Sequence, residues 1–449
     1  MNNIETMEYK DINEVMYKYN HKSGLNVFVI PKKGYSKKYA VFATHFGSIN
    51  TKFSEEGNRK VTTVPEGIAH FLEHKLFDQK DGSIMDKFSL LGSEPNAYTS
   101  FNQTVYLFSC TDKFNENFGL LLNFVQNPYF VDESIEKEKS IIKQEINMYK
   151  DNANWRSFFN FLKALYKNNN VRNEILGTSE SIDNINKEIL LKCYNNFYNL
   201  TNMVVCIVGD VDKDEVFAQI EKQIENNYKS ETEVRRIFPK EPEKINVPYI
   251  EEKMQISMPL FQIGYKDNFI NNIAWSKNQI NNIVDPSTDE LFENKTDLLK
   301  REISIKILLE MIMGRSSSLY LSLYEQGLIN NTFDFDYTAE ENYAYSVISG
   351  ESQDPIKVKE IILQNINEKF SNLNEQDFVR VRNAMYGRNL RWFNSVETIS
   401  GRFVSSFFKD NYLFDYFNLY DKIDFEYIIN IMKEHFKHEY FAMSVIMPS

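Results

Sequence analysis

Three residues in the first third of the chain have the types and the spacing of a metal site. His70 and His74 are four positions apart in the segment 65–77, and Glu73 lies between them. If this segment is helical, side chains four residues apart share one face at about 6 Å, so both imidazoles can bind one metal ion. Two imidazoles and a carboxylate suit zinc, and a nearby carboxylate can take a proton from a zinc-bound water. The pattern H-x-x-E-H therefore predicts a zinc site able to hydrolyse a bond.

A second segment offers the further ligand that such a site requires. The helical pattern of residues 134–149 places the apolar side chains on one stripe, formed by Ile135, Ile142, Ile146 and Tyr149. Glu138 and Glu145 fall on or beside this stripe. Carboxylates that face a protein core are costly unless they are paired or bound to a metal, so this helix predicts a nearby cation.

Both patterns also have a purely structural explanation. Two of the six histidines can fall four residues apart on an ordinary amphipathic helix. Glu138 and Glu145 can lie at the solvent edge of their stripe, where carboxylates usually are. Each segment alone leaves this alternative open.

Other candidate sites are weaker. Asp210, Asp212, Asp214 and Glu221 match positions 1, 3, 5 and 12 of an EF-hand loop, but Glu215 stands where the turn needs glycine. We expect Asp212 to cap the following helix instead.

His435 and His438 could share a helix face, but they lie at a charged helix end without an evident third ligand. We expect both to be solvated surface residues. The segment from Gly314 to Ser318 lacks the G-x-x-x-x-G-K-[ST] pattern of a phosphate loop, and we expect a helix-packing turn there.

The two metal-site segments together resemble the pitrilysin family of zinc metallopeptidases, which includes insulin-degrading enzyme and the mitochondrial processing peptidases. In this family H-x-x-E-H is followed, after a long spacer, by E-x-x-x-x-x-x-E. The corresponding residues here are His70, Glu73, His74, Glu138 and Glu145. Further similarity covers the whole chain, including the segments 92–100, 202–212 and 314–320. Residues 136–156 resemble a bacterial branch of YmfH type most closely.

The resemblance implies a role for each matched residue. His70, His74 and Glu145 would hold zinc, Glu73 would accept a proton from the zinc-bound water, and Glu138 would support the site. Asn96 and Ala97 would present main chain to an extended peptide that adds a strand to the sheet edge. Members of the family enclose unfolded peptides between two bowl-shaped halves. We therefore expect a zinc endopeptidase, and peptide scavenging or leader removal would use the same site.

One part of the family pattern is missing. Complete members carry an Arg and a Tyr in a segment resembling L-R-E-x-x-G-L-A-Y, where they bind substrate and stabilise the oxyanion. Here Tyr324 and Asn330 stand at those positions. The resemblance thus implies a heterodimer in which a homologous subunit supplies the Arg and Tyr. The alternative is a non-catalytic peptide-binding or scaffold subunit, although such subunits usually lose a residue of the zinc motif.

The elements that must position these residues predict an α+β fold. Strands are expected at 26–31, 40–45, 104–110, 203–208, 258–265 and 441–447. Helices are expected at 66–77, from 83, and at 114–125, 134–150, 155–167, 187–198, 296–314, 375–409 and 425–436. Each half of the sequence ends with a helix followed by an apolar strand. We therefore predict two related domains, each an antiparallel-rich sheet covered by helices as in a processing-peptidase half.

Composition places the proposed domain boundary and excludes some partners. The charged, proline-containing stretch 229–247 is the predicted linker between a zinc-bearing domain 1–228 and a second, non-metal domain 248–449. The net charge of −12 has the wrong sign for nucleic-acid binding. No apolar run approaches the ~20 residues that span a bilayer, so no membrane association is expected.

The cellular location is predicted from the cysteines and the N-terminal residues. Cys110, Cys193 and Cys206 are too few and too scattered for a disulfide framework, so they are predicted to be buried thiols. The first residues lack the pattern of a signal peptide. These observations favour the cytoplasm.

Overall fold

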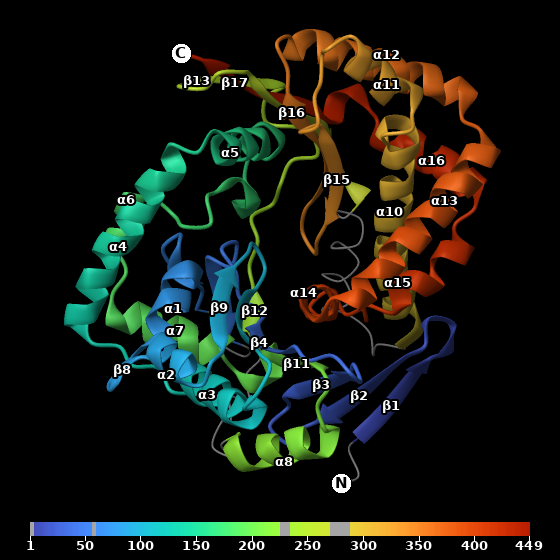
Figure 1. Ribbon diagram of the computed structural model, residues 1–449. Helices are drawn as coiled ribbons and strands as arrows, with labels where there is room; N and C mark the ends of the chain where they lie inside the picture. Colours follow the sequence, from blue (N-terminus) through green and yellow to red (C-terminus); the bar gives the residue numbers. More distant parts are fainter. Residues whose placement is uncertain (1–3, 56–59, 225–233, 270–287) are drawn as a thin grey trace. The chain divides into compact units, whose positions relative to one another are not determined.

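The computed structural model describes residues 4–55, 60–224, 234–269 and 288–449 (Figure 1). The chain divides into two compact units. Unit 1 comprises Met1–Ile146, Asn173–Phe238 and Leu390–Phe408, and unit 2 comprises Asn147–Arg172, Pro239–Asn389 and Lys409–Ser449. Each unit therefore contains one segment from the other half of the chain. The predicted domains 1–228 and 248–449 follow chain order and remain predictions, and part of the predicted linker, 229–233, lies outside the described residues.

Unit 1 is built on a seven-stranded sheet. In spatial order its strands are β1 (Ile4–Tyr9), β2 (Glu14–Asn20), β3 (Asn26–Pro31), β11 (Met203–Gly209), β4 (Lys38–Thr44), β10 (Thr104–Cys110) and β9 (Glu94–Thr99). Every residue of β10 and β11 is buried, as the apolar runs in their sequences predict. β9 is an outer strand of this sheet and pairs with β10 on its inner side.

Smaller elements and helices complete unit 1. β12 (Val234–Arg236), β5 (Lys52–Glu55) and β6 (Thr62–Thr63) form a second sheet, and β7 (Asp78–Gln79) pairs with β8 (Gly82–Ser83). The helices are α1 (Ile68–Leu76), α2 (Ile84–Leu90), α3 (Phe114–Gln126), α6 (Ser179–Asp183), α7 (Lys187–Phe197), α8 (Lys213–Gln223) and α14 (Val396–Phe407). α4 (Asp132–Lys150) belongs to unit 1 up to Ile146, and its last four residues belong to unit 2.

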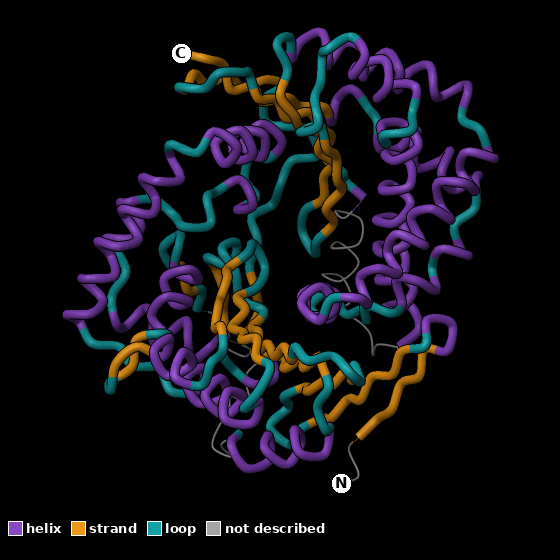
Figure 2. The backbone as a smooth tube through the Cα atoms, in the orientation of Figure 1, coloured by secondary structure: helices purple, strands orange, loops and turns teal. Residues whose placement is uncertain are grey.

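Unit 2 is built on a five-stranded sheet. Its order is β13 (Tyr249–Met254), β17 (Phe441–Pro448), β14 (Leu260–Lys266), β16 (Ala344–Glu351) and β15 (Asp334–Ala339). The helices are α5 (Ala153–Leu165), α10 (Thr288–Met313), α11 (Ser318–Glu325), α12 (Pro355–Asn372), α13 (Glu375–Asn389), α15 (Asp415–Asn418) and α16 (Phe425–His435). Figure 2 distinguishes these helices and strands along the backbone.

The two sheets repeat one topology. In unit 1, β3 pairs in parallel with β11, which is antiparallel to β4, and β10 then lies between β4 and β9. In unit 2, β13 pairs in parallel with β17, which is antiparallel to β14, and β16 then lies between β14 and β15. The corresponding strands also follow one another in the same chain order. The predicted α+β class with two related domains is confirmed.

The two halves of the chain exchange one helix each. α14 comes from the second half, yet it packs on β11 and β4 of unit 1, where Phe403 contacts Phe28 with 4.7 Å between ring centroids. α5 comes from the first half and packs on β13, β14 and β17 of unit 2. In each unit, therefore, one face of the main sheet is covered by a helix from the other half.

The structure corrects one predicted helix and adds elements that the sequence pattern did not indicate. The prediction of one continuous helix over 375–409 is wrong, because α13 ends at Asn389 and a 3₁₀ segment, Leu390–Asn394, follows. Ser395 then starts α14 by accepting a hydrogen bond from the backbone N–H of Thr398. The β1–β2 hairpin, β16 and α12 had not been predicted.

A buried polar network lies in the core of unit 2. Asp267 accepts two hydrogen bonds from Arg301, at 2.9 and 3.1 Å, and one from the hydroxyl of Tyr337 at 2.8 Å. Nδ1 of His435 is 3.4 Å from the same carboxylate. Burial alone would raise the pKa of Asp267, but its interactions with His435 and Arg301 outweigh burial and hold that pKa well below its usual range.

This network corrects the expectation for His435. The residue is 1% exposed rather than solvated, and its Nε2 is 2.8 Å from Oγ of Ser346. The sequence pattern did not reveal this position because the partners of His435 come from distant strands. His438 is exposed, as expected.

Three further expectations can be compared with the structure. Cys110, Cys193 and Cys206 are all free and buried, which confirms the predicted buried thiols. Asp212 caps α8, with its carboxylate accepting from the backbone N–H groups of Asp214 and Glu215, as predicted. Among the described helices, none is both long and apolar enough to cross a membrane.

Candidate metal centre

The helix that carries His70, Glu73 and His74 is almost wholly buried. α1 packs against β9 and β10, and eight of its side chains are buried, including His70 and Glu73. The residue before it, the N-cap Gly67, has φ of +83°, and a Cβ there would come within 2.3 Å of the carbonyl oxygen of Leu176. Glycine alone fits this turn, so the start of α1 and the direction of its side chains are closely determined.

The second carboxylate segment forms the predicted helix. Ile135, Ile142 and Ile146 of α4 are buried in the core. This packing turns Glu138 and Glu145 toward α1, with side chains only 15% and 25% exposed. Both carboxylates lie within reach of His74, Glu138 at 2.9 Å from Nδ1 and Glu145 at 3.7 Å from Nε2.

The imidazoles and the Glu145 carboxylate converge on one point. Oε2 of Glu145 is 3.8 Å from Nε2 of His70 and 3.7 Å from Nε2 of His74. The candidate ligand atoms of all three residues lie within 4.8 Å of one another. In the part of the chain that the structure describes, this is the one group of three such side chains.

The donor set fits zinc. Ligand atoms bound at about 2.0–2.1 Å in a tetrahedral site lie about 3.4 Å apart, close to the two distances to Glu145. Two imidazole nitrogens and one carboxylate oxygen are ligands that zinc accepts, and the set leaves a fourth position for water. His70, His74 and Glu145 can therefore hold one zinc ion, the set that the resemblance implies.

Burial and charge give the two histidines different properties. Burial, aided by the neighbouring His74, lowers the pKa of His70 to about 3, so this imidazole is neutral and can donate a lone pair. Burial also opposes the charged form of His74. The hydrogen bond with Glu138 and the charges of Glu73 and Glu145 outweigh that effect, and they raise the pKa of His74.

Glu138 contacts the candidate site through His74. Nδ1 of His74 donates to Oε1 of Glu138 at 2.9 Å. This bond places the proton on Nδ1 and leaves the lone pair of Nε2 directed toward Glu145, which is the usual arrangement of a metal-binding histidine. The supporting position assigned to Glu138 by resemblance thus has a geometric basis.

Glu73 lies beside the histidines with one oxygen already occupied. The hydroxyl of Thr99, at the end of β9, donates to Oε2 of Glu73 at 2.6 Å. Burial raises the pKa of Glu73, whereas this hydrogen bond and the nearby His74 act against burial. The sequence did not single out Thr99, although this residue lies in the matched segment 92–100, because no pattern revealed which side chain its hydroxyl would reach.

Asn96 and Ala97 lie on the outer strand β9, as the resemblance implies. Asn96 is exposed, and its side-chain oxygen accepts from the backbone N–H of Ala97 at 2.9 Å. On its other side β9 pairs with β10, with Ala97 opposite Tyr106. Within the described residues β9 has no strand on its other side, so it presents a free edge in the same unit as His70 and Glu73. The substrate contacts of Asn96 and Ala97 remain predictions.

Unit 2 contains a second group of residues of catalytic types, but it is not an active site. Ser346, His435 and Asp267 occur in the order of a Ser-His-Asp triad, with the distances given above. Ser346 is completely buried, however, and so no substrate can reach its hydroxyl. This network stabilises the core of unit 2.

The fold and the metal centre define the class of M16 peptidases, and the chain belongs to this family. The family model described as Insulinase (Peptidase family M16) matches residues 55–179, which include all five residues of the two glutamate and histidine motifs. The model described as Peptidase M16 inactive domain matches residues 184–385. The resemblance stated from the sequence is confirmed.

Individual relatives agree with this classification. The uncharacterized zinc protease YmfH of Bacillus subtilis (strain 168) is 38% identical over 446 residues, which cover 99% of each chain. The crystal structure of a candidate M16-like peptidase from Alicyclobacillus acidocaldarius has a TM-score of 0.88 at 29% identity, again over 99% of each chain. The mitochondrial-processing peptidase subunit beta of Caenorhabditis elegans is 31% identical over 176 residues, 38% of each chain.

Proposed function

We propose that this protein is a zinc-dependent endopeptidase that cleaves unfolded peptides. The observation that carries the proposal is the convergence of His70, His74 and Glu145 beside the buried carboxylate of Glu73. Membership of a peptidase family and the zinc-protease name of the B. subtilis relative support it. A purely structural helix would not need two histidines and three carboxylates gathered at one buried point.

The residues of the site divide the chemistry among them. A zinc ion held by His70, His74 and Glu145 would lower the pKa of a bound water toward ~7. Glu73 accepts the proton of that water on Oε1, because Thr99 occupies Oε2. Glu138 holds the Nδ1 proton of His74 and keeps the imidazole oriented. The oxygen of that water adds to the carbonyl carbon of the peptide bond, and Glu73 then gives the proton it accepted to the nitrogen that leaves as the C–N bond breaks.

The substrate proposed for this site is a peptide in extended conformation. Such a peptide would add a strand to the free edge of β9, along Asn96 and Ala97. To pair with the backbone N–H of Ala97 it would displace the side chain of Asn96, which now accepts from that group. Only chains without their own tertiary structure can be bound in this way. Leader-type peptides and peptide fragments both meet that condition.

We further infer that the active form is a heterodimer in which this chain supplies the metal. At the position expected for Arg, Tyr324 lies on α11 and is 53% exposed. At the position expected for Tyr, Asn330 has an amide in place of a hydroxyl, and this amide is engaged by Glu351 and Thr332. The C. elegans relative is named as a subunit, which supports a two-chain enzyme.

The second candidate function is a non-catalytic, peptide-binding subunit. The missing Arg and Tyr favour it, because loss of an oxyanion donor typically costs ~10²–10³ in rate. The complete zinc motif opposes it. A library of unstructured peptides, incubated with the zinc-loaded chain, separates the two functions. Cleavage that disappears in Glu73→Gln supports the peptidase, and binding without cleavage, even with homologous chains added, supports the second function.

A further inference from the structure

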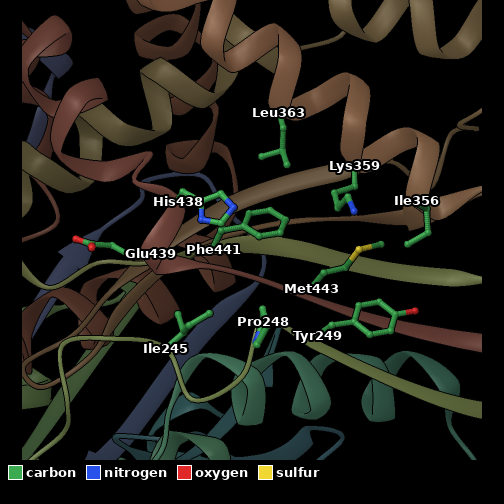
Figure 3. A pocket seen from close by; sticks show the side chains of 10 residues that line it. All are labelled: Ile245, Pro248, Tyr249, Ile356, Lys359, Leu363, His438, Glu439, Phe441 and Met443. Carbon is green, nitrogen blue, oxygen red and sulfur yellow. The ribbon is translucent and has the colours of Figure 1, made fainter.

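A groove of about 670 Å³ lies in unit 2 (Figure 3). Ile356 and Lys359 of α12 border one side, and Pro248 and Tyr249 border the other. Between them lies the floor, which includes Met443 of β17. The volume lies within the range of protein binding sites, and most of the lining is apolar.

The groove lies on the face of the sheet that α5 does not cover. Glu252 of β13 is bonded to Arg156 of α5 at 3.0 Å. Tyr249 is an odd number of residues away on the same strand, so its side chain points to the opposite face. Met443 pairs with Tyr249 and shares that face.

In unit 1 the corresponding place is filled by a helix. β3, β11 and α3 correspond to β13, β17 and α12 in the repeated topology, and α8 packs between α3 and β3. Phe217 of α8 contacts Tyr19, which pairs with Val27 on β3, at 5.1 Å between ring centroids. Phe28, the next residue, contacts α14 on the other face. α8 therefore covers the sheet face opposite the exchanged helix α14. The groove in unit 2 lies on the equivalent face, opposite the exchanged helix α5.

We propose that this groove binds an amphipathic helix of a partner polypeptide, in the position that α8 occupies in unit 1. The apolar side chains of α8 that fill its own site are Val216, Phe217 and Ile220, all of them buried. Among the described residues of unit 2, no helix takes this place. Tyr249 and Ile356 are instead 41% and 40% exposed, so the groove leaves large apolar side chains in contact with water.

The charged residue at the rim of the groove indicates that the partner helix should carry a carboxylate. Lys359 is partly buried at the rim and has no ion-pair partner among the described residues, and Glu439, which also lines the groove, lies far from it beside His438 (Figure 3). A partner helix with an acidic residue beside its apolar stripe would pair with this ammonium. The occupant is thus a helix with apolar residues at spacings of one, three and four and at least one carboxylate next to them.

The test uses α8 itself as the probe. A fluorescent peptide of residues 211–224, held helical by a lactam bridge between Ala218→Glu and Lys222, is titrated into the full chain carrying Glu73→Gln. That substitution prevents cleavage of the probe if the protein is a peptidase. We expect saturable binding, with slower hydrogen exchange in α12 and β13. The same peptide with Phe217→Ser should bind at least about tenfold more weakly.

Substitutions in the groove locate the site. Ile356→Glu should weaken binding about tenfold or more, and Lys359→Glu by a smaller factor that shrinks as salt is added. Val379→Glu is the matched control, because Val379 is equally exposed, at 40%, on α13 and does not line the groove. All three positions are on helix surfaces, so unchanged thermal unfolding verifies that each variant folds.

Three results would overturn the proposal. One is the absence of binding at millimolar peptide. Another is binding that Ile356→Glu and Val379→Glu affect equally, because the peptide would then bind elsewhere. The third is concentration-dependent dimerisation that Ile356→Glu abolishes, since this would assign the groove to a second copy of the chain. None of these results bears on the metal centre, so the proposed peptidase activity is tested separately.

Discussion

The hydroxyl of Thr99 donates a 2.6 Å hydrogen bond to one carboxylate oxygen of Glu73. The two residues belong to β9 and α1, which pack against each other in unit 1. This contact links the strand proposed to bind the peptide with the residue proposed to accept the proton. A shift of β9 would therefore move the base as well as the substrate.

Thr99→Val should lower kcat about 10- to 100-fold, because a hydrogen bond to a charged group contributes about 1.5–3 kcal/mol. KM and zinc content should remain near those of the unaltered protein. Thr99→Ser keeps the hydroxyl and should recover most of the rate. Steady-state kinetics with one peptide substrate compares both variants with the unaltered protein, and a Thr99→Val enzyme with full kcat would contradict the role given to this hydrogen bond.

His74→Ala and Glu73→Gln should separate metal binding from proton transfer. The unaltered chain should hold about one zinc, and His74→Ala should lose it, because the two remaining ligands bind far more weakly. Glu73→Gln should keep both zinc and fold while losing turnover. Elemental analysis after gel filtration measures the metal. Full zinc in His74→Ala would remove the basis of the proposed site.

Glu138→Gln should weaken zinc binding about 10- to 100-fold without abolishing it. The amide can still accept the proton of His74 Nδ1 but has lost the charge that supports the imidazole. Competition with a chelator of known affinity gives the two dissociation constants. Glu136→Gln is the control, since Glu136 is exposed on the same helix and pairs with Lys139 instead. Equal zinc affinities for the two variants would mean that Glu138 does not support the metal.

Asp267→Asn should destabilise unit 2 by about 3–5 kcal/mol, because it removes the buried counter-charge of Arg301 and leaves only the exposed carboxylate of Glu434 to pair with this guanidinium. The folded-state pKa of Asp267 lies below its unfolded value, so its contribution is present above the unfolded pKa of about 4 and is lost as the pH falls. Urea unfolding at several pH values should therefore show a flatter acid limb for Asp267→Asn. Asp421→Asn, at an exposed position, should leave both stability and its pH dependence unchanged.

The chain alone should cleave peptides slowly and respond to a partner. A homologous chain that carries the Arg and Tyr but lacks H-x-x-E-H should raise the rate by about 10²–10³ when mixed with this one. Mutating the Arg or Tyr of that partner should abolish the gain. Sedimentation should detect a complex with one zinc site. Full activity of this chain as a monomer or homodimer would refute the heterodimer.

The sequence by itself determined the family and most of the elements that carry the proposed metal ligands. His70, Glu73 and His74 could be recognised because helical geometry converts a spacing of three and four residues into a shared face. Glu138 and Glu145 could be recognised because their helix has a clear apolar stripe. In both cases the information is local, as it is for the apolar runs that became β10 and β11.

The tertiary structure alone decided the contacts between segments far apart in the chain. Thr99 meets Glu73, and His435 meets Ser346 and Asp267, only once strands and helices have packed, so local periodicity carried no sign of either. The exchange of α5 and α14 is likewise a property of packing, because an amphipathic helix does not specify which sheet it will cover. The open groove beside β13 became visible only when the two repeated sheets could be compared, since a missing neighbour leaves no signal in the residues that would contact it.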